Sequence, residues 1–163
     1  MIERARVSTA GAAFPIPQSP EDFERMVLSS PQSSFLWTQY MAYHVAQGHV
    51  EACRKVAERA LRSISVREAS ELRNIWVAYL NVEFQFGTKE SLETLFRRAA
   101  QNSDNPEKMH HQLLAIYESH DAAQSAYLLL RSMLLRFKSS TEVGVAYAKH
   151  LVRHGKADAS NPQ

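Results

Sequence analysis

The chain has 163 residues, of which 45% are hydrophobic and 22% are charged, which supports one compact domain or a short solenoid with a continuous core. A formal charge of +2 is too close to neutral to indicate nucleic-acid binding by the molecule as a whole. Residues 121–163 are mildly basic, with six Lys/Arg and three Asp/Glu. The single cysteine excludes an internal disulfide and fits a reducing compartment. Cys53 lies in an apolar helix stripe, so we interpret it as a packing residue.

The beginning of the chain predicts a linker. The opening "MIERARVSTAGAAFPIPQSP" contains two Arg and one acidic residue, as a mitochondrial presequence would, but it lacks a long amphipathic run and contains three prolines. We therefore predict a disordered linker over 1–18. Residues 26–50 contain no Lys, Arg, Asp or Glu, but Pro31 interrupts them and polar residues recur at helical spacing, so we reject a membrane span.

Almost everything after Pro20 follows a period of 3.6, and no period-two alternation holds up, which predicts an all-α chain. Ser19 as N-cap and Pro20 at the first helical position indicate a short lead-in helix. Helices over about 33–47 and 49–63 follow, and Gly48 between them is a C-terminal cap signal.

The next hairpin repeats this pattern. Its helices are predicted over about 69–86 and 88–101, Gly87 ends the first helix, and Thr88 with Ser91 marks the start of the second.

The later repeats depart from the pattern. A third repeat has no tryptophan and carries Leu113 where tyrosine is expected. A fourth begins with a helix that has Gly144 at the tryptophan position, Tyr147 at the tyrosine position and Gly155 at its end. A last helix is expected to start in "KADAS", so the array looks truncated.

Several residues recur 39 positions apart: Trp37 and Trp76, Tyr40 and Tyr79, Gly48 and Gly87, and the Arg59-Ala60 and Arg98-Ala99 pairs. The tryptophan, tyrosine and glycine of each helix lie within about a quarter of its circumference, so the aromatics point into one seam. We therefore predict a structural repeat core rather than a base-stacking platform. The predicted core residues are Trp37, Tyr40, Ala60, Trp76, Tyr79, Ala99 and Tyr147.

No motif for catalysis, metal binding or cofactor binding stands out. His150 and His154 lie one helical turn apart, but no further ligand is placed by the sequence, so we interpret them as solvated or RNA-facing. His110 and His111 are adjacent and therefore point about 100° apart, so they cannot chelate together. Phosphate-loop, dinucleotide and nucleophile motifs are missing. We predict no catalytic, cofactor or metal residue and no enzyme activity.

Basic residues give the candidate contacts with RNA or a protein partner. They follow similar faces of the predicted helices, which could align into a stripe for phosphates, although we favour the interpretation as an ordinary solvated face. The candidates are Arg54, Lys55, Arg131, Arg136, Lys138, Lys149 and Arg153.

The chain resembles HAT (half-a-TPR) repeats in three features: W-x-x-Y, a glycine eleven residues after the Trp, and R-A in the following helix. The full TPR signature is absent. The stretches "EDFERMVLSSPQSSFLW", "ISVREASELRNIWVAYLN" and "FGTKESL" resemble the C-terminal HAT domain of the ribosomal-RNA-processing protein 5 family, called programmed cell death protein 11 in animals.

The resemblance implies a right-handed α-α superhelix (solenoid) of HAT/TPR-like helical hairpins. It covers a repeat domain over 19–160, divided into a lead-in helix over 20–29, repeat 1 over about 32–64, repeat 2 over about 69–102, repeat 3 over about 105–138 and a partial repeat 4 over about 139–160.

As function, the resemblance implies a non-catalytic scaffold in the nucleus and nucleolus that supports pre-rRNA processing in the small-subunit processome, including 18S and 5.8S/ITS1 maturation. The expected partners are pre-ribosomal assembly factors, and pre-rRNA directly or through the complex, with no membrane partner. The alternatives are a direct RNA-binding solenoid and a HAT module of splicing or mRNA 3′-end processing. An open C-terminal repeat would also permit self-association.

Overall fold

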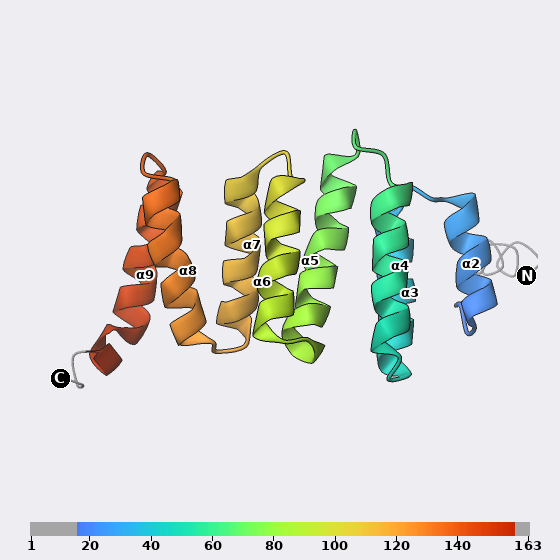
Figure 1. Cartoon of the computed structure of the whole chain (residues 1–163), viewed down its shortest axis with the longest axis horizontal. Coiled ribbons are helices and arrows are strands. Elements are labelled where there is room, and N and C mark those ends of the chain that lie inside the picture. The colour runs from blue at the N-terminus through green and yellow to red at the C-terminus, as the bar shows by residue number, and fades with distance from the viewer. Residues whose placement is uncertain (1–15, 159–163) are drawn as a thin grey trace, which may run out of the picture. The chain divides into compact units, whose positions relative to one another are not determined.

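The computed structural model describes residues 16–158, with side chains as far as Gly155, and all regular structure in that part is α-helical (Figure 1). In chain order, the helices are α2 (Pro20–Ser29), α3 (Ser34–Ala46), α4 (Val50–Ser63), α5 (Ala69–Phe86), α6 (Lys89–Gln101), α7 (Pro106–Ser119), α8 (Ala123–Arg136) and α9 (Thr141–Asp158). The fold class predicted from the sequence, an all-α array of helical hairpins, is confirmed. None of these helices is long and apolar enough to cross a bilayer.

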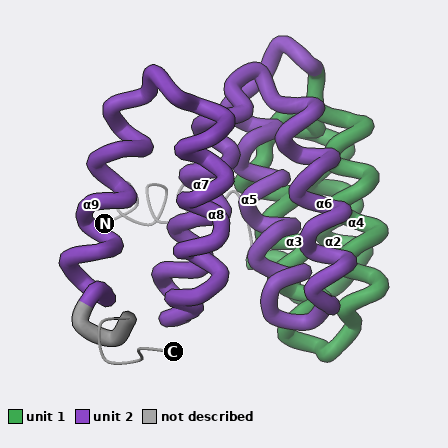
Figure 2. Tube along the Cα trace, turned by 60° about the vertical axis from the view of Figure 1, so that its left-hand side comes forward, with its two compact units in different colours: residues 1–65 green, residues 66–163 purple. Residues whose placement is uncertain are grey.

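The chain divides into two compact units, one ending at Ser65 and one beginning at Val66, and Figure 2 colours them separately. In the first unit, α2 packs against α3, and α3 packs against α4. In the second unit, each helix from α5 to α9 packs against the next, and α5 also contacts α7. The repeat limits within 19–160 stay a prediction; the predicted linker up to residue 15 and the repeat domain beyond 158 lie outside the described residues.

Two helix starts follow directly from local sequence. The Ser19 hydroxyl accepts a hydrogen bond of 3.3 Å from the Asp22 N–H, and Pro20 occupies the first helical position of α2. At α6, the Thr88 hydroxyl accepts from the Ser91 N–H at 3.1 Å, and the Ser91 hydroxyl accepts from the Thr88 N–H at 2.8 Å. Each cap satisfies backbone donors that have no partner within the helix. Both starts agree with the sequence prediction.

The first two glycines of the repeat end their helices for different reasons. Gly48 follows α3 with a φ of 76°, a left-handed conformation that favours glycine. Gly87 ends α5 with an extended backbone instead, and a Cβ atom there would lie only 2.1 Å from Oε1 of Glu83. Glycine is therefore favoured at position 87 because the buried Glu83 carboxylate approaches the backbone closely.

The prediction that Gly155 ends its helix is wrong, because α9 continues to Asp158. The described part of "KADAS" therefore belongs to α9 and does not begin a new helix. A glycine within a helix costs only about 1 kcal/mol relative to alanine, so it ends a helix only where the following chain turns.

Candidate functional site

Each repeated tryptophan lies under the arginine of the repeated Arg-Ala pair. The guanidinium carbon of Arg59 in α4 is 5.5 Å from the ring centroid of Trp37 in α3, and that of Arg98 in α6 is 5.6 Å from the ring of Trp76 in α5. These are cation–π distances. Six of the predicted core residues are buried: Trp37, Tyr40, Ala60, Trp76, Tyr79 and Ala99. The repeated motif thus marks the seam within each hairpin.

In the first unit, Glu24 of α2 joins this seam. Arg59 donates two hydrogen bonds to the Glu24 carboxylate, at 2.6 and 2.8 Å, and the Tyr40 hydroxyl donates a third at 2.8 Å. Phe23 stacks on Tyr40 with ring centroids 5.0 Å apart. The Trp37 indole N–H donates to the carbonyl of Pro31 at 2.9 Å. One bidentate arginine therefore connects all three helices of the unit.

The pKa values of this network agree with a structural role. The hydrogen bonds from Arg59 lower the pKa of Glu24 to about 2, against the opposing effect of burial. Burial and the neighbouring Glu24 carboxylate raise the pKa of Tyr40 to about 12. Glu24 therefore stays ionised and Tyr40 stays protonated at neutral pH, and neither group is poised for proton transfer.

The seventh predicted core residue, Tyr147 in α9, is only half-buried. It packs against an aliphatic cluster made of Leu114, Ala126, Leu130, Met133 and Val143. A Cβ atom built on Gly144, at the predicted tryptophan position, would meet no atom within 4 Å. The last part of the array is thus held by aliphatic packing.

Three of the seven basic candidates, Arg54, Lys55 and Arg131, line neither of the two depressions described below. Arg54 forms an ion pair with Glu51 within α4, and Lys55 is exposed on the same helix. Arg131 of α8 donates a hydrogen bond of 3.0 Å to the Tyr127 hydroxyl. These three residues do not form one patch within a single unit, because Arg54 and Lys55 belong to the first unit and Arg131 belongs to the second.

The other four candidates line two depressions in the second unit. The first, called here the basic hollow, has a volume of about 1140 Å³ and is bounded by the start of α7, the end of α8 and the start of α9. Arg136 and Lys138 line it, together with Lys108, which the sequence analysis did not select. The second, called here the α7–α9 groove, has a volume of about 580 Å³ and is lined by Lys149 and Arg153.

Adjacent histidines on α7 have different environments. His110 is buried between Phe96 and Phe137, with ring centroids 4.8 and 5.0 Å away, and this burial lowers its pKa. His111 instead lines both the basic hollow and the α7–α9 groove. The prediction that these two histidines cannot act together agrees with the separate environments.

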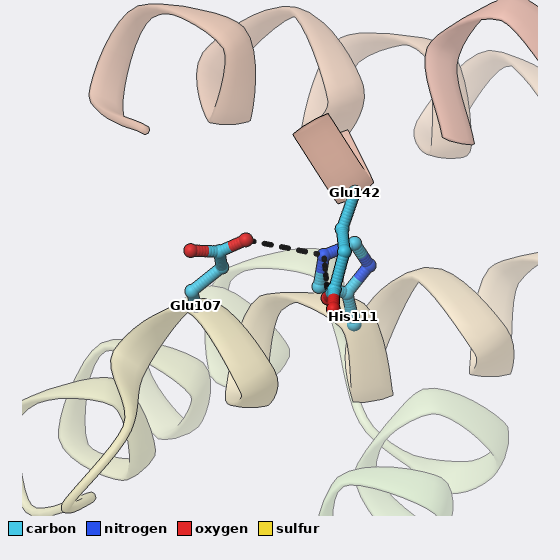
Figure 3. Close-up of side chains that lie close together, drawn as sticks. All are labelled: Glu107, His111 and Glu142. Carbon is cyan, nitrogen blue, oxygen red and sulfur yellow. Dashed lines mark ion pairs between the residues drawn. The ribbon is translucent and has the colours of Figure 1, made fainter. Parts of the chain in front are cut away.

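His111 is accompanied by two carboxylates (Figure 3). Its Nε2 atom lies 3.7 Å from Oε1 of Glu107, one turn earlier on α7, and 4.0 Å from Oε2 of Glu142 on α9. The sequence analysis missed this group. The Glu107–His111 spacing is visible in the sequence, but only tertiary packing brings Glu142 to it.

The interpretation of His150 as solvated or RNA-facing is wrong, because its side chain is 5% exposed. Its ring lies 6.2 Å from that of Tyr127 and 4.6 Å from that of the half-buried His154. The prediction that His150 and His154 lie one helical turn apart was correct, but Tyr127 of α8 packs beside His150.

Comparison with known proteins identifies the repeat. Residues 12–105 match the family model described as the pre-mRNA-splicing factor Syf1/CNRKL1 N-terminal HAT repeat. The chain belongs to the HAT-repeat family. The Trp–Arg seams of α3–α4 and α5–α6 are therefore HAT seams, and the matched range ends where the basic hollow begins, at Asn105.

Longer alignments link the HAT chain to individual relatives. It is 46% identical over 145 residues to the human Protein RRP5 homolog, which covers 89% of this chain and 8% of the relative. It is 43% identical over 129 residues to the Arabidopsis thaliana rRNA biogenesis protein RRP5, covering 78% of this chain and 7% of the relative. It is 37% identical over 146 residues to Schizosaccharomyces pombe rRNA biogenesis protein rrp5, covering 90% of this chain and 9% of the relative. The chain thus spans less than a tenth of each.

Proposed function

We propose that this HAT chain is a non-catalytic interaction module of ribosome biogenesis that supports pre-rRNA processing. The observation that carries the proposal is the similarity to proteins named for rRNA biogenesis, at 37–46% identity over 89–90% of the chain in the human and S. pombe relatives. An alignment of 145 residues extends beyond the family match at 12–105 and into α7–α9. The similarity therefore includes the helices that form both depressions.

The finer parts of the proposal concern place and partners. We propose that the module lies in the C-terminal part of a longer nucleolar protein and docks assembly factors of the small-subunit processome, in support of 18S and 5.8S/ITS1 maturation. Helical-repeat arrays suit such docking because stacked hairpins present extended surfaces. Self-association through the last repeat remains a further proposal.

Protein docking is favoured over direct RNA binding by the distribution of charge. The basic hollow carries Lys108, Arg136 and Lys138, but Glu107 and Glu142 line the same hollow. Carboxylates among the basic residues repel phosphates and reduce the field on which nonspecific RNA affinity depends. Contact with pre-rRNA is therefore proposed to occur mainly through the assembled complex.

The family model is named for a splicing factor, which keeps a splicing role as the competing proposal. Identification of the RNAs that co-purify with the tagged chain separates the two. We expect enrichment of pre-rRNA that spans 18S and ITS1 sequences. Enrichment of spliceosomal small nuclear RNAs instead would overturn the rRNA proposal.

A titration of the purified chain with a structured pre-rRNA fragment tests docking against direct RNA binding. We expect no sub-micromolar binding at physiological salt, and little effect of reversing Arg136 and Lys138 to glutamate. Tight, steeply salt-dependent binding that this double variant abolishes would instead establish the RNA-binding alternative, because phosphate contacts release counterions. Reversal of Lys89, an exposed lysine of the same unit that is not among the candidates, is the control.

A further inference from the structure

We propose that Glu107, His111 and Glu142 form a divalent transition-metal site, of the zinc class, that links α7 to the first turn of α9. The three residues each offer one ligand atom, and these atoms all lie within 4.8 Å of one another (Figure 3). The inference does not rest on the proposed role in ribosome biogenesis, but a bound cation would neutralise the two carboxylates that the charge argument against direct RNA binding uses.

The distances are close to those that a metal ion requires. Zinc bonds to histidine nitrogen and carboxylate oxygen are about 2.0–2.2 Å, so tetrahedral ligand atoms lie roughly 3.4 Å apart. His111 Nε2 lies 3.7 Å from Glu107 Oε1 and 4.0 Å from Glu142 Oε2, too far for hydrogen bonds. The longest separation among the three ligand atoms, up to 4.8 Å, must shorten by about 1.4 Å, so small side-chain rotations of both glutamates are needed to close a three-ligand shell.

The His111 nitrogen provides the second observation. The His111 side chain is 26% exposed, but its Nε2 atom is shielded from solvent and has no hydrogen-bond partner among the described residues. A buried polar nitrogen without a partner is costly, and coordination to a metal ion satisfies it. The adjacent His110 differs from His111 in this respect, because its Nδ1 atom has a partner: the Pro106 carbonyl oxygen lies 2.7 Å away.

The two carboxylates have no basic partner of their own in the described part of the chain. Within the described residues, neither Glu107 nor Glu142 forms an ion pair with lysine or arginine. Both carboxylates lie within ion-pair distance of the same histidine, His111. The Ser140 hydroxyl, which caps α9, donates a hydrogen bond to Glu107 and orients it. Such a contact resembles the outer-shell hydrogen bonds that hold metal ligands in place.

The mixed donor set indicates the class of metal. One imidazole nitrogen with two carboxylates suits zinc and its first-row neighbours, whereas magnesium and calcium prefer oxygen ligands alone. Because the cluster lines the basic hollow, solvent can reach the remaining coordination position. Bound metal would also neutralise the two carboxylates beside Lys108, Arg136 and Lys138.

Zinc titration of the 163-residue chain, by calorimetry and by competition with a chromophoric chelator, tests the site. We expect saturable binding of one Zn²⁺ per chain. Glu142→Gln, at a side chain 81% exposed and thus not needed for folding, is expected to weaken that binding by roughly tenfold or more. Glu118→Gln on the exposed part of α7 is the matched control and should leave binding unchanged.

Nitrogen NMR of the histidine rings identifies the ligand directly. Zinc should shift the Nε2 resonance of His111, and His111→Asn should abolish the saturable binding. The His150–His154 pair is the competing site, and His154→Gln separates it from the proposed one. Failure to bind zinc, or binding that persists in Glu142→Gln but is lost in His154→Gln, would overturn the proposal.

Discussion

The α3–α4 hairpin and the α8–α9 pair solve the same packing problem with different side chains. In α3–α4, a buried tryptophan lies against Arg59, and that arginine also binds Glu24 of α2. In α8–α9, Leu130, Met133 and Val143 supply the buried contacts, and Tyr147 is only half-buried against them. The repeated Trp, Tyr and Arg-Ala residues therefore indicate which helix pairs are held by a tryptophan–arginine seam. Their absence does not mean that a segment fails to form packed helices.

The two regions also differ in what they leave exposed. Several large apolar side chains of α8 and α9 remain accessible: Leu128, Leu135, Val145, Leu151 and Val152. In α3 and α4, Phe35 is the residue of this kind. Loss of the motif thus coincides with an increase in accessible apolar surface.

Truncation of the seam is the largest expected effect. Trp37→Ala removes a side chain that is 2% exposed and leaves Arg59 without its ring, so we expect a loss of about 3–5 kcal/mol in the free energy of unfolding. Urea denaturation followed by circular dichroism measures it. Phe35→Ala, on the same helix but 67% exposed, should cost less than about 0.5 kcal/mol. Equal losses for the two variants would contradict the seam model.

Gly87 offers a second way to disturb a seam. An alanine Cβ would lie 2.1 Å from Oε1 of Glu83, so the carboxylate must move away from the Ser91 hydroxyl that donates to it. We expect Gly87→Ala to cost about 1–3 kcal/mol, because the displaced carboxylate is buried. Thermal unfolding would show this, and an unchanged melting temperature would mean that Glu83 relaxes freely.

The Glu24 network has a pH signature. Because its pKa is about 2 in the folded chain and 4.5 in the ordinary case, Glu24 stabilises the fold fully above pH 4.5 and loses this effect as the pH falls towards 2. After allowance for solvent screening of a partly exposed pair, Glu24→Gln should cost about 1 kcal/mol at neutral pH.

Denaturation at a series of pH values checks the sign of this effect. Glu24→Gln should flatten the dependence of stability on pH between 4.5 and 2, whereas Glu21→Gln, exposed on the same helix, should not. A wild-type and a Glu24→Gln curve that run parallel through this range would argue against the ion pair.

The smallest expected effect is a stabilisation of the last helix. Gly144 lies within α9, and a Cβ atom there meets open space, so Gly144→Ala should add about 0.5–1 kcal/mol. Gly48→Ala should instead destabilise, because its φ of 76° strains any residue with a Cβ atom. Melting temperatures that move in opposite directions would confirm that the two glycines have different roles.

Sequence alone was sufficient for the local features of this protein. It determined the helix starts at Ser19 and Thr88, the end of the first repeat helix at Gly48, and the all-α class, because capping and helical periodicity depend on residues only a few positions apart. It also selected Trp37 and Trp76 as buried seam residues, since their spacing places them on the apolar face of each helix.

Tertiary structure decided the features that join distant residues. Arg59 meets Glu24 across 35 positions, Glu142 reaches His111 only because α8 packs against both α7 and α9, and burial of His150 depends on its neighbours in α8 and α9. No helical period specifies such encounters, because the rotation and separation of neighbouring helices are set by how all their side chains pack together.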